Sequence, residues 1–156
     1  MAEQHIINSK AVYEKLCALL DEIGWKYEKD EQKLEVNFSV VGDDIPMDFV
    51  CTVDEARQLI VINSALPVKF APENRVDGAI VTCYINQKLV DGNFDYDYET
   101  GAMYFRMTSS YRGSIISRDM LLYMIEYACY KVDDYNDKLT LVANGLMSVE
   151  TFCKKA

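Results

Sequence analysis

The first half of the chain begins with a helical pattern of apolar residues. Residues 8–23 carry apolar side chains at spacings of four, three, one and three, which predicts an amphipathic helix. These side chains are Val12, Leu16, Leu19, Leu20 and Ile23. Asn8 or Ser9 can accept hydrogen bonds from the free amides at the start of this helix, and Gly24 can close its other end.

The pattern then changes to strict alternation, which is typical of strands with one buried face. Residues 34–40 alternate apolar and polar side chains, and residues 47–53 repeat the alternation after a short turn. Residues 59–66 are apolar enough to predict a central strand that is covered on both faces. Residues 28–33 read as a turn before these strands. Three consecutive strands with short links favour an antiparallel meander.

A second helix is predicted from residue 72 to Gly92. Pro72 lacks an amide hydrogen and therefore suits the first helical turn. One stripe of this helix carries Val76, Ile80, Cys83, Gln87 and Val90. Gly78 lies inside the helix, where it costs up to about 1 kcal/mol relative to alanine. Ordinary packing, or the close approach of another backbone, would explain this glycine.

The last predicted helix begins at Ser117, with Asp119 in its first turn, and ends at Gly145. Its apolar residues follow spacings of four and three throughout. They are Leu121, Ile125, Ala128, Val132, Tyr135, Leu139 and Val142. This spacing is compatible with a coiled coil, but three heptads are near the minimum for one. A helix that lies on a sheet is the favoured interpretation.

Residues 89–107 concentrate acidic and aromatic side chains and admit two interpretations. A hairpin with Thr100 and Gly101 at its centre places Phe94, Tyr96, Tyr98, Met103, Phe105 and Met107 on one apolar face. The other face then brings Asp95 next to Arg106. A four-residue turn keeps the same faces with a shifted register, whereas a three-residue turn mixes them.

The alternative interpretation is a cation site built from Asp91, Asp95, Asp97 and Glu99. A calcium loop counted from Asp91 requires glycine at its sixth position and glutamate at its twelfth, and neither is present. Asp95 and Asp97 lie about 7 Å apart along an extended strand, so their mutual repulsion in water is small. The strand pair is favoured, and we expect no metal and no cofactor.

Composition narrows the possible functions. The chain has 156 residues, which indicates a single domain over residues 1–156, and a net charge of −9, which disfavours nucleic acid and anionic membranes. Its start does not read as a signal peptide, and no apolar run is long enough for a transmembrane helix. These features predict a cytoplasmic protein.

Catalytic side chains are sparse. The five cysteines are widely spaced among apolar neighbours and read as reduced core thiols. The one histidine, His5, stands near the N-terminus, so a cysteine–histidine pair or a zinc site is not expected. Arg106 and Arg112 with the nearby serines form a weak anion signal, because no glycine-rich helix entry accompanies them. We therefore predict no catalytic residues.

Residues 84–107 followed by residues 117–139 resemble the YbjN-like family of bacterial proteins, whose fold is similar to that of type III secretion chaperones. The similarity covers mainly residues 72–145 and is carried by Asn86, Gly92, Phe94, Asp97, Gly101, Tyr104, Arg106, Asp134 and Tyr135. It implies an α+β fold with a helix, a three-stranded antiparallel meander, a helix, a β-hairpin and a helix. Each of these residues also has a structural reading: the glycines supply unusual backbone angles, the aromatic residues pack, and Asn86 bonds a nearby carbonyl or amide.

The resemblance implies a non-enzymatic, chaperone-like adaptor of the bacterial cytosol that binds a polypeptide client or a second copy of itself. The YbjN-like label also admits a sensory transduction regulator that binds a small ligand in a buried polar pocket. A third hypothesis, an enzyme with paired carboxylates, would require one acid with a raised pKa in a cleft. Val76, Ile80, Cys83 and Tyr84 exceed what one small sheet can cover, which suggests a self-association surface.

Overall fold

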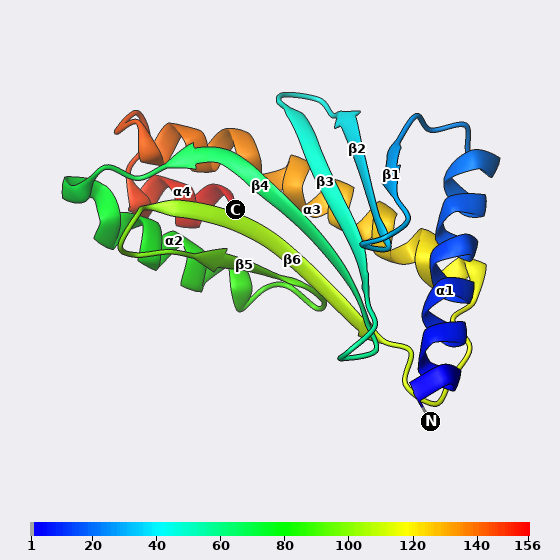
Figure 1. Ribbon diagram of the computed structural model, residues 1–156. Coiled ribbons are helices and arrows are strands. Elements are labelled where there is room, and N and C mark those ends of the chain that lie inside the picture. The colour runs from blue at the N-terminus through cyan, green and yellow to red at the C-terminus, as the bar shows by residue number, and fades with distance from the viewer. Residues whose placement is uncertain (1) are drawn as a thin grey trace.

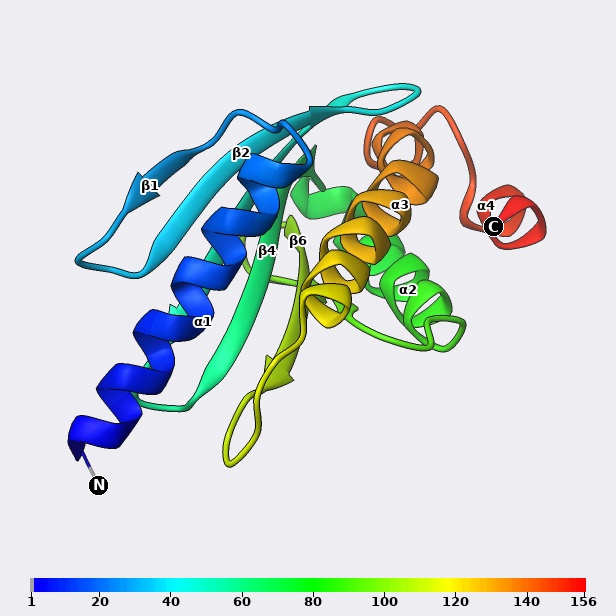
Figure 2. The same cartoon turned by 90° about the vertical axis from the view of Figure 1, so that its right-hand side faces the viewer.

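The computed structural model describes the backbone of residues 2–156, and the side chains of Glu3 and of residues 8–156. The chain forms one six-stranded sheet, and helices α1, α2 and α3 cover one face of it (Figures 1 and 2). The elements are α1 Ala2–Glu22, β1 Glu28–Asp30, β2 Glu35–Val41, β3 Pro46–Asp54, β4 Leu59–Lys69, a 3-10 turn Pro72–Asn74, α2 Arg75–Asn86, β5 Asn93–Tyr96, β6 Ala102–Ser110, α3 Arg118–Ala143 and α4 Val149–Lys155. This α+β order confirms the expected fold class, with one strand and one helix more than predicted.

The strands follow the order β1-β2-β3-β4-β6-β5, and every neighbouring pair is antiparallel. The predicted meander is therefore confirmed, and it begins one strand earlier, at β1. The chain leaves the sheet after β4, forms α2, and returns along the far edge as β5. Strand β6 then inserts between β4 and β5 (Figure 1).

The predicted alternation in β3 is confirmed, because its four apolar side chains all point to the helix-covered face. They are Met47, Phe49, Cys51 and Val53, each at most 4% exposed. The expectation that residues 59–66 are covered on both faces is wrong. Ile60 and Ile62 are buried, but Val61 and Asn63 on the opposite face are only half-buried. Helices cover only one side of this sheet, so the other side remains open.

The first helix begins at Ala2 rather than at Asn8 or Ser9. Ser9 lies within the helix, and its buried hydroxyl forms a hydrogen bond of 2.6 Å with the hydroxyl of Tyr111. The apolar stripe from Val12 to Leu20 is buried as predicted. His5 belongs to this helix, but its side chain lies outside the described residues.

The predicted turn at residues 28–33 is only partly a turn. Its first three residues form β1, which pairs with β2 at the edge of the sheet. The chain then reverses at Asp30, whose carboxylate accepts hydrogen bonds from the amides of Gln32 and Lys33. Three residues are too few to show an alternating pattern, so this strand has no signal in the sequence.

Helix α3 begins as predicted, because the Ser117 hydroxyl accepts a hydrogen bond from the Met120 amide at 3.1 Å. All seven residues of its predicted apolar stripe are buried, and the helix lies on β4 and β6. This arrangement confirms the helix on a sheet over the coiled coil. In the part of the chain that the structure describes, no helix is both long enough and apolar enough to cross a membrane.

Helix α2 is shorter than predicted, since it ends at Asn86 and not near Gly92. Pro72 stands in the 3-10 turn that leads into it, as expected. Gly78 faces the ring of Tyr96, and a Cβ at this position would collide with the Tyr96 hydroxyl. That hydroxyl donates to the Arg75 carbonyl at 2.9 Å. Gly78 is therefore explained by a close side chain, not by a close backbone.

Candidate binding surfaces

The segment rich in acidic and aromatic residues forms the strand pair β5–β6. Phe94 lies opposite Phe105 and Tyr96 opposite Met103, so the turn spans the four residues 98–101. The two-residue turn centred on Thr100 and Gly101 is therefore wrong, and the four-residue alternative is confirmed. The amide of Asp97 donates to the Ala102 carbonyl at 2.9 Å and thereby closes this turn. Because both registers keep the same faces, Phe94, Met103, Phe105 and Met107 are buried as predicted, whereas Tyr98 lies exposed in the turn.

Three acidic side chains of this segment bond protein groups. The carboxylate of Asp95 bonds the Arg106 guanidinium at 2.9 and 3.2 Å. Asp97 accepts hydrogen bonds from the amides of Glu99 and Thr100. The Thr100 side chain first, and then these amides, lower the pKa of Asp97. Asp91 accepts from the Tyr123 hydroxyl at 3.3 Å. The strand-pair interpretation is confirmed.

Paired-carboxylate chemistry requires one acid whose pKa is raised. Asp95 is instead bound to an arginine, and the pKa of Asp97 is lowered, first of all by its hydrogen bonds to Thr100. This environment gives no support to a general acid–base pair of Asp95 and Asp97. Among the described side chains, no three or more His, Cys, Asp or Glu residues are grouped so that they could hold a metal ion.

Asn86 fastens the edge strand β5 to the end of α2. Its side-chain amide donates to the Phe94 carbonyl at 2.9 Å, and its side-chain oxygen accepts from the Phe94 amide at 2.8 Å. Asn86 therefore bonds the strand as a neighbouring strand would.

Gly92 and Gly101 adopt positive φ angles of 64° and 76°, which confirms the structural reading of both glycines. The ring of Phe94 packs edge-on against Tyr135 at 5.8 Å.

The remaining residues that carry the resemblance lie at the surface. Tyr104 is 42% exposed on the open face of the sheet. Asp134 is exposed on α3 and pairs with Lys131 at 3.3 Å. Arg106 is held by Asp95, so it would have to leave that carboxylate to bind an anion together with Arg112. The structure does not gather these residues into one site.

The cysteines differ in exposure, although all five are free thiols. Cys51 is fully buried, which raises the pKa of its thiol. Burial also raises the pKa of Cys129 to about 12. Cys17 and Cys153 are half-buried, and Cys83 is exposed. The expectation of a core thiol is therefore wrong for Cys83, which lies on the outer face of α2.

The four residues suggested for self-association lie on α2, and we call them the α2 patch. Val76 is 57% and Ile80 is 45% exposed, and Cys83 is also exposed. Tyr84 is half-buried at the margin of the patch, where its hydroxyl donates to the Cys153 carbonyl at 2.6 Å. The helix buries a different stripe, which consists of Gly78, Val81, Thr82 and Ile85.

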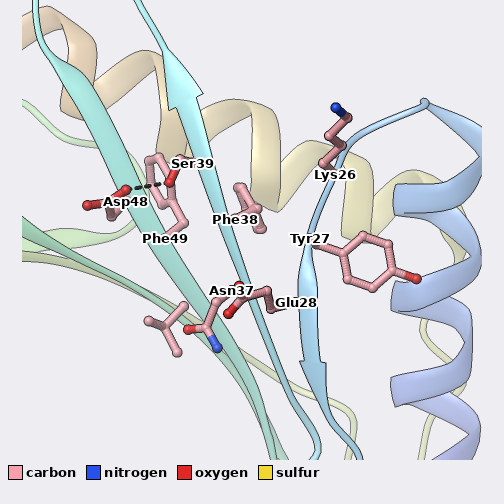
Figure 3. A pocket seen from close by; sticks show the side chains of 9 residues that line it. Lys26, Tyr27, Glu28, Asn37, Phe38, Ser39, Asp48 and Phe49 are labelled. Carbon is pink, nitrogen blue, oxygen red and sulfur yellow. Dashed lines mark hydrogen bonds between the residues drawn. The ribbon is translucent and has the colours of Figure 1, made fainter.

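A cavity lies at the opposite edge of the sheet, across β1, β2 and β3 (Figure 3). This edge cavity has a volume of about 510 Å³. Its lining residues are Lys26, Tyr27, Glu28, Asn37, Phe38, Ser39, Asp48, Phe49 and Val50. Glu28, Asn37 and Val50 are cross-strand neighbours, so they share one row on the open face of the sheet. The Ser39 hydroxyl donates to the Asp48 carboxylate at 2.5 Å in the next row.

The edge cavity exists because β1 pairs with only part of β2. Pairing begins at Glu28 opposite Asn37, and the preceding residues Lys26 and Tyr27 diverge from β2. Tyr27 points to α1, where its hydroxyl donates to the Asp21 carboxylate at 2.9 Å (Figure 3). Residues 38–41 of β2 therefore have no strand partner on the β1 side. Alternation alone could not reveal this edge, since it does not show where a neighbouring strand ends.

No protein-family model and no curated protein match this sequence. The fold does match solved structures. A chain of the crystal structure of YbjN from E. coli is 13% identical, with a TM-score of 0.57, and the match covers 85% of this chain and 90% of that one.

Two protein complexes give similar matches. A chain of the HopA1–SchA chaperone–effector complex is 12% identical with a TM-score of 0.50, and 78% of this chain and 90% of that chain are covered. A chain of the ExsC–ExsE complex is also 12% identical with a TM-score of 0.50, and coverage is 82% and 95%. The YbjN-like and chaperone-like fold implied by the sequence is therefore confirmed.

Proposed function

We propose that this protein is a non-enzymatic, chaperone-like adaptor of the bacterial cytosol that binds an extended polypeptide at the edge cavity. We treat the chain as one domain, since its buried side chains form one core. The observation that carries the proposal is the open edge of β2 within a fold shared with a chain of a chaperone–effector complex.

The geometry of β2 supports a strand-like client. Backbone amides and carbonyls that point away from β3 over residues 38–41 can pair with an added strand, because β1 does not reach them. Val41, at the end of this edge, is 83% exposed. The net charge of −9 further favours basic or amphipathic clients over acidic ones.

A lysine on the open edge tests the proposal, since charged side chains on edge strands oppose strand addition. Val41→Lys should abolish the capture of one or two polypeptides that the wild-type protein retains from an extract of its source cells. Val90→Lys is the matched control, because Val90 is 93% exposed in the loop after α2, far from β2 in the sequence. Hydrogen exchange with the purified client should then show slower exchange at residues 38–41.

A small-ligand regulator is the second candidate, and one neighbour in fold, YbjN, is described as a proposed transcription regulator. The same experiment separates the two functions. If the protein retains no polypeptide but binds a metabolite tightly, or if both lysine variants retain the client equally, the edge cavity is not a client site.

We further propose that the α2 patch joins two copies of the chain. Val76, Ile80 and Cys83 are exposed together on one helix, and apolar side chains grouped in this way often mark an interface. The α2 patch and the open edge of β2 belong to opposite ends of the strand order, so a dimer through α2 would leave the client edge free.

A further inference from the structure

Helix α4 lies at the outer edge of the helical layer. A loop over residues 144–148 leads away from the end of α3 and returns as α4 beside α2 (Figure 2). The helix contacts α2, and α3 to a lesser extent. It has only seven residues, against 26 in α3.

One face of α4 is apolar and packs inward. Phe152 is fully buried, and Val149, Cys153 and Ala156 are partly buried against the core. These positions follow helical spacing, and the opposite face carries the exposed residues Glu150, Thr151, Lys154 and Lys155. Many helical peptides bind a groove in this way, as short amphipathic helices whose apolar side chains follow this spacing.

Side chains from α2 and from the turn after it donate hydrogen bonds to backbone carbonyls at the C-terminal end of α4. The Tyr84 hydroxyl donates to the Cys153 carbonyl at 2.6 Å, and the Lys88 ammonium donates to the Ala156 carbonyl at 2.6 Å. These groups, together with the surface that receives Phe152, form what we call the α4 seat. The seat is suited to the apolar face and the carbonyl end of one helix.

Helix α4 is attached to the rest of the protein by far fewer buried side chains than α3. Phe152 is its single fully buried side chain, whereas α3 buries ten residues. A helix of two turns is not stable by itself in water, so α4 depends on its seat. Elements with few buried contacts open locally before the whole protein unfolds.

We propose that α4 is a releasable strap, and that its seat binds an amphipathic helix of a partner polypeptide. The partner helix carries apolar side chains at the spacing of Val149, Phe152, Cys153 and Ala156, with a large aromatic residue at the second position. This surface is separate from the edge cavity and shares Tyr84 with the α2 patch, so the inference does not rest on the proposed client site. The α4 residues themselves define the chemistry of the occupant.

The cysteines offer an internal measure of strap release. Maleimide labelling of the full chain, resolved by peptide mass spectrometry, compares Cys153 on α4 with the exposed Cys83 and the fully buried Cys51. We expect Phe152→Ala to accelerate labelling of Cys153 at least about tenfold relative to Cys83, with Cys51 unchanged. Tyr84→Phe, which removes only the bond to the Cys153 carbonyl, should act in the same direction more weakly. Parallel acceleration of Cys51, or an unchanged Cys153 in both variants, would overturn the strap.

A peptide tests the seat. A labelled peptide with the sequence of residues 147–156, with serine in place of Cys153, should bind the full-length Phe152→Ala chain at least about tenfold more tightly than wild type, whose own α4 competes for the seat. The same peptide with alanine in place of Phe152 should not bind. Equal binding of the two peptides, or no binding of either one to the Phe152→Ala chain, would rule out a helix-binding seat.

Discussion

Gly101 combines a backbone angle and a contact that only glycine satisfies. Its φ angle is +76°, and a Cβ here would collide with the Phe70 carbonyl oxygen. The Phe70 amide also donates to the Gly101 carbonyl at 2.9 Å, so neither chain can move away freely. Gly145 offers a contrast, because its φ angle is +72° and a Cβ there would meet no atom within 4 Å.

Gly101→Ala should therefore destabilise the protein much more than Gly145→Ala. The left-handed backbone costs an alanine about 1–2 kcal/mol at either site. The collision with Phe70 should add about 1–3 kcal/mol at position 101 alone. Urea denaturation of both variants measures the difference, and equal losses of unfolding free energy would contradict the collision.

Prediction from the sequence was most successful for residues whose role is local. The Ser117 cap and the turn glycines follow from the backbone geometry of the residues beside them. Asn86 was expected to bond a carbonyl or an amide, and it bonds both groups of Phe94. The identity of that partner depends on how α2 meets β5, which no local pattern contains.

At the level of elements, the contact between α2 and β5 depends on the absence of a side chain at Gly78. Gly78 leaves space for the Tyr96 ring, which packs edge-on against Phe70 at 5.6 Å. Two effects of opposite sign compete in Gly78→Ala. Alanine favours the helix by about 1 kcal/mol, while its methyl group collides with Tyr96.

We expect the collision to dominate, because overpacking typically costs about 1–3 kcal/mol and the Tyr96 hydroxyl is fixed by its bond to Arg75. Gly78→Ala should lower the unfolding free energy in wild type, and should raise it by up to about 1 kcal/mol in a Tyr96→Ala background. A double-mutant cycle by urea denaturation measures this coupling. A stabilising Gly78→Ala in both backgrounds would show that the ring can move aside.

The elements that were missed are the shortest ones. Strand β1 has three residues and α4 has two turns, so neither provides a full period of alternation or of helical spacing. Helix α2 raises a different problem, since it carries two apolar stripes. Periodicity identified the stripe with Val76 and Ile80, yet the sheet receives the stripe with Val81 and Ile85. Only the position of the sheet decides between them.

For the molecule as a whole, the candidate site was less predictable than the fold. The order of most elements could be predicted from the sequence because the longer strands show their buried face as an alternating pattern, whereas β1 shows none. The edge cavity arises from a mismatch in length between β1 and β2, and such a mismatch is a property of pairing rather than of either strand. The exposed α2 patch was anticipated as an excess of apolar residues, but its use for self-association stays a prediction.

Self-association through α2 predicts a protein of twice the monomer mass in light scattering at tens of micromolar. Replacing both Val76 and Ile80 by aspartate should convert it to a monomer, because a dimer would bury these charges without partners. Val90→Asp should remain dimeric, since Val90 is as freely exposed but lies outside the α2 patch. A monomeric wild type would remove α2 as a dimer interface and would leave the client edge unaffected.

The folded protein should lose stability at alkaline pH, because burial raises the pKa of a tyrosine hydroxyl and of a cysteine thiol. Burial, with a smaller effect of the Cys17 thiol, raises the pKa of Tyr13 to about 12 from 10.0. Burial likewise raises the pKa of Cys129 to about 12 from 9.0. A group with a raised pKa in the folded state contributes its full stability below its unfolded pKa and loses it as pH rises toward the folded value. The melting temperature should therefore fall between pH 9 and pH 12.

Tyr13→Phe isolates one part of this effect. Among the described residues the buried Tyr13 hydroxyl has no well-formed hydrogen bond and only a weak contact with the Cys17 thiol, so its removal at pH 7 should leave the melting temperature unchanged or slightly higher. At pH 11 the variant should be clearly more stable than wild type, because it no longer has to keep this phenol protonated in the core. Thermal denaturation across the pH range, with tyrosinate absorbance followed in parallel, measures both parts. Equal losses in the two proteins would mean that Tyr13 ionises without opening the interface between α1 and the sheet.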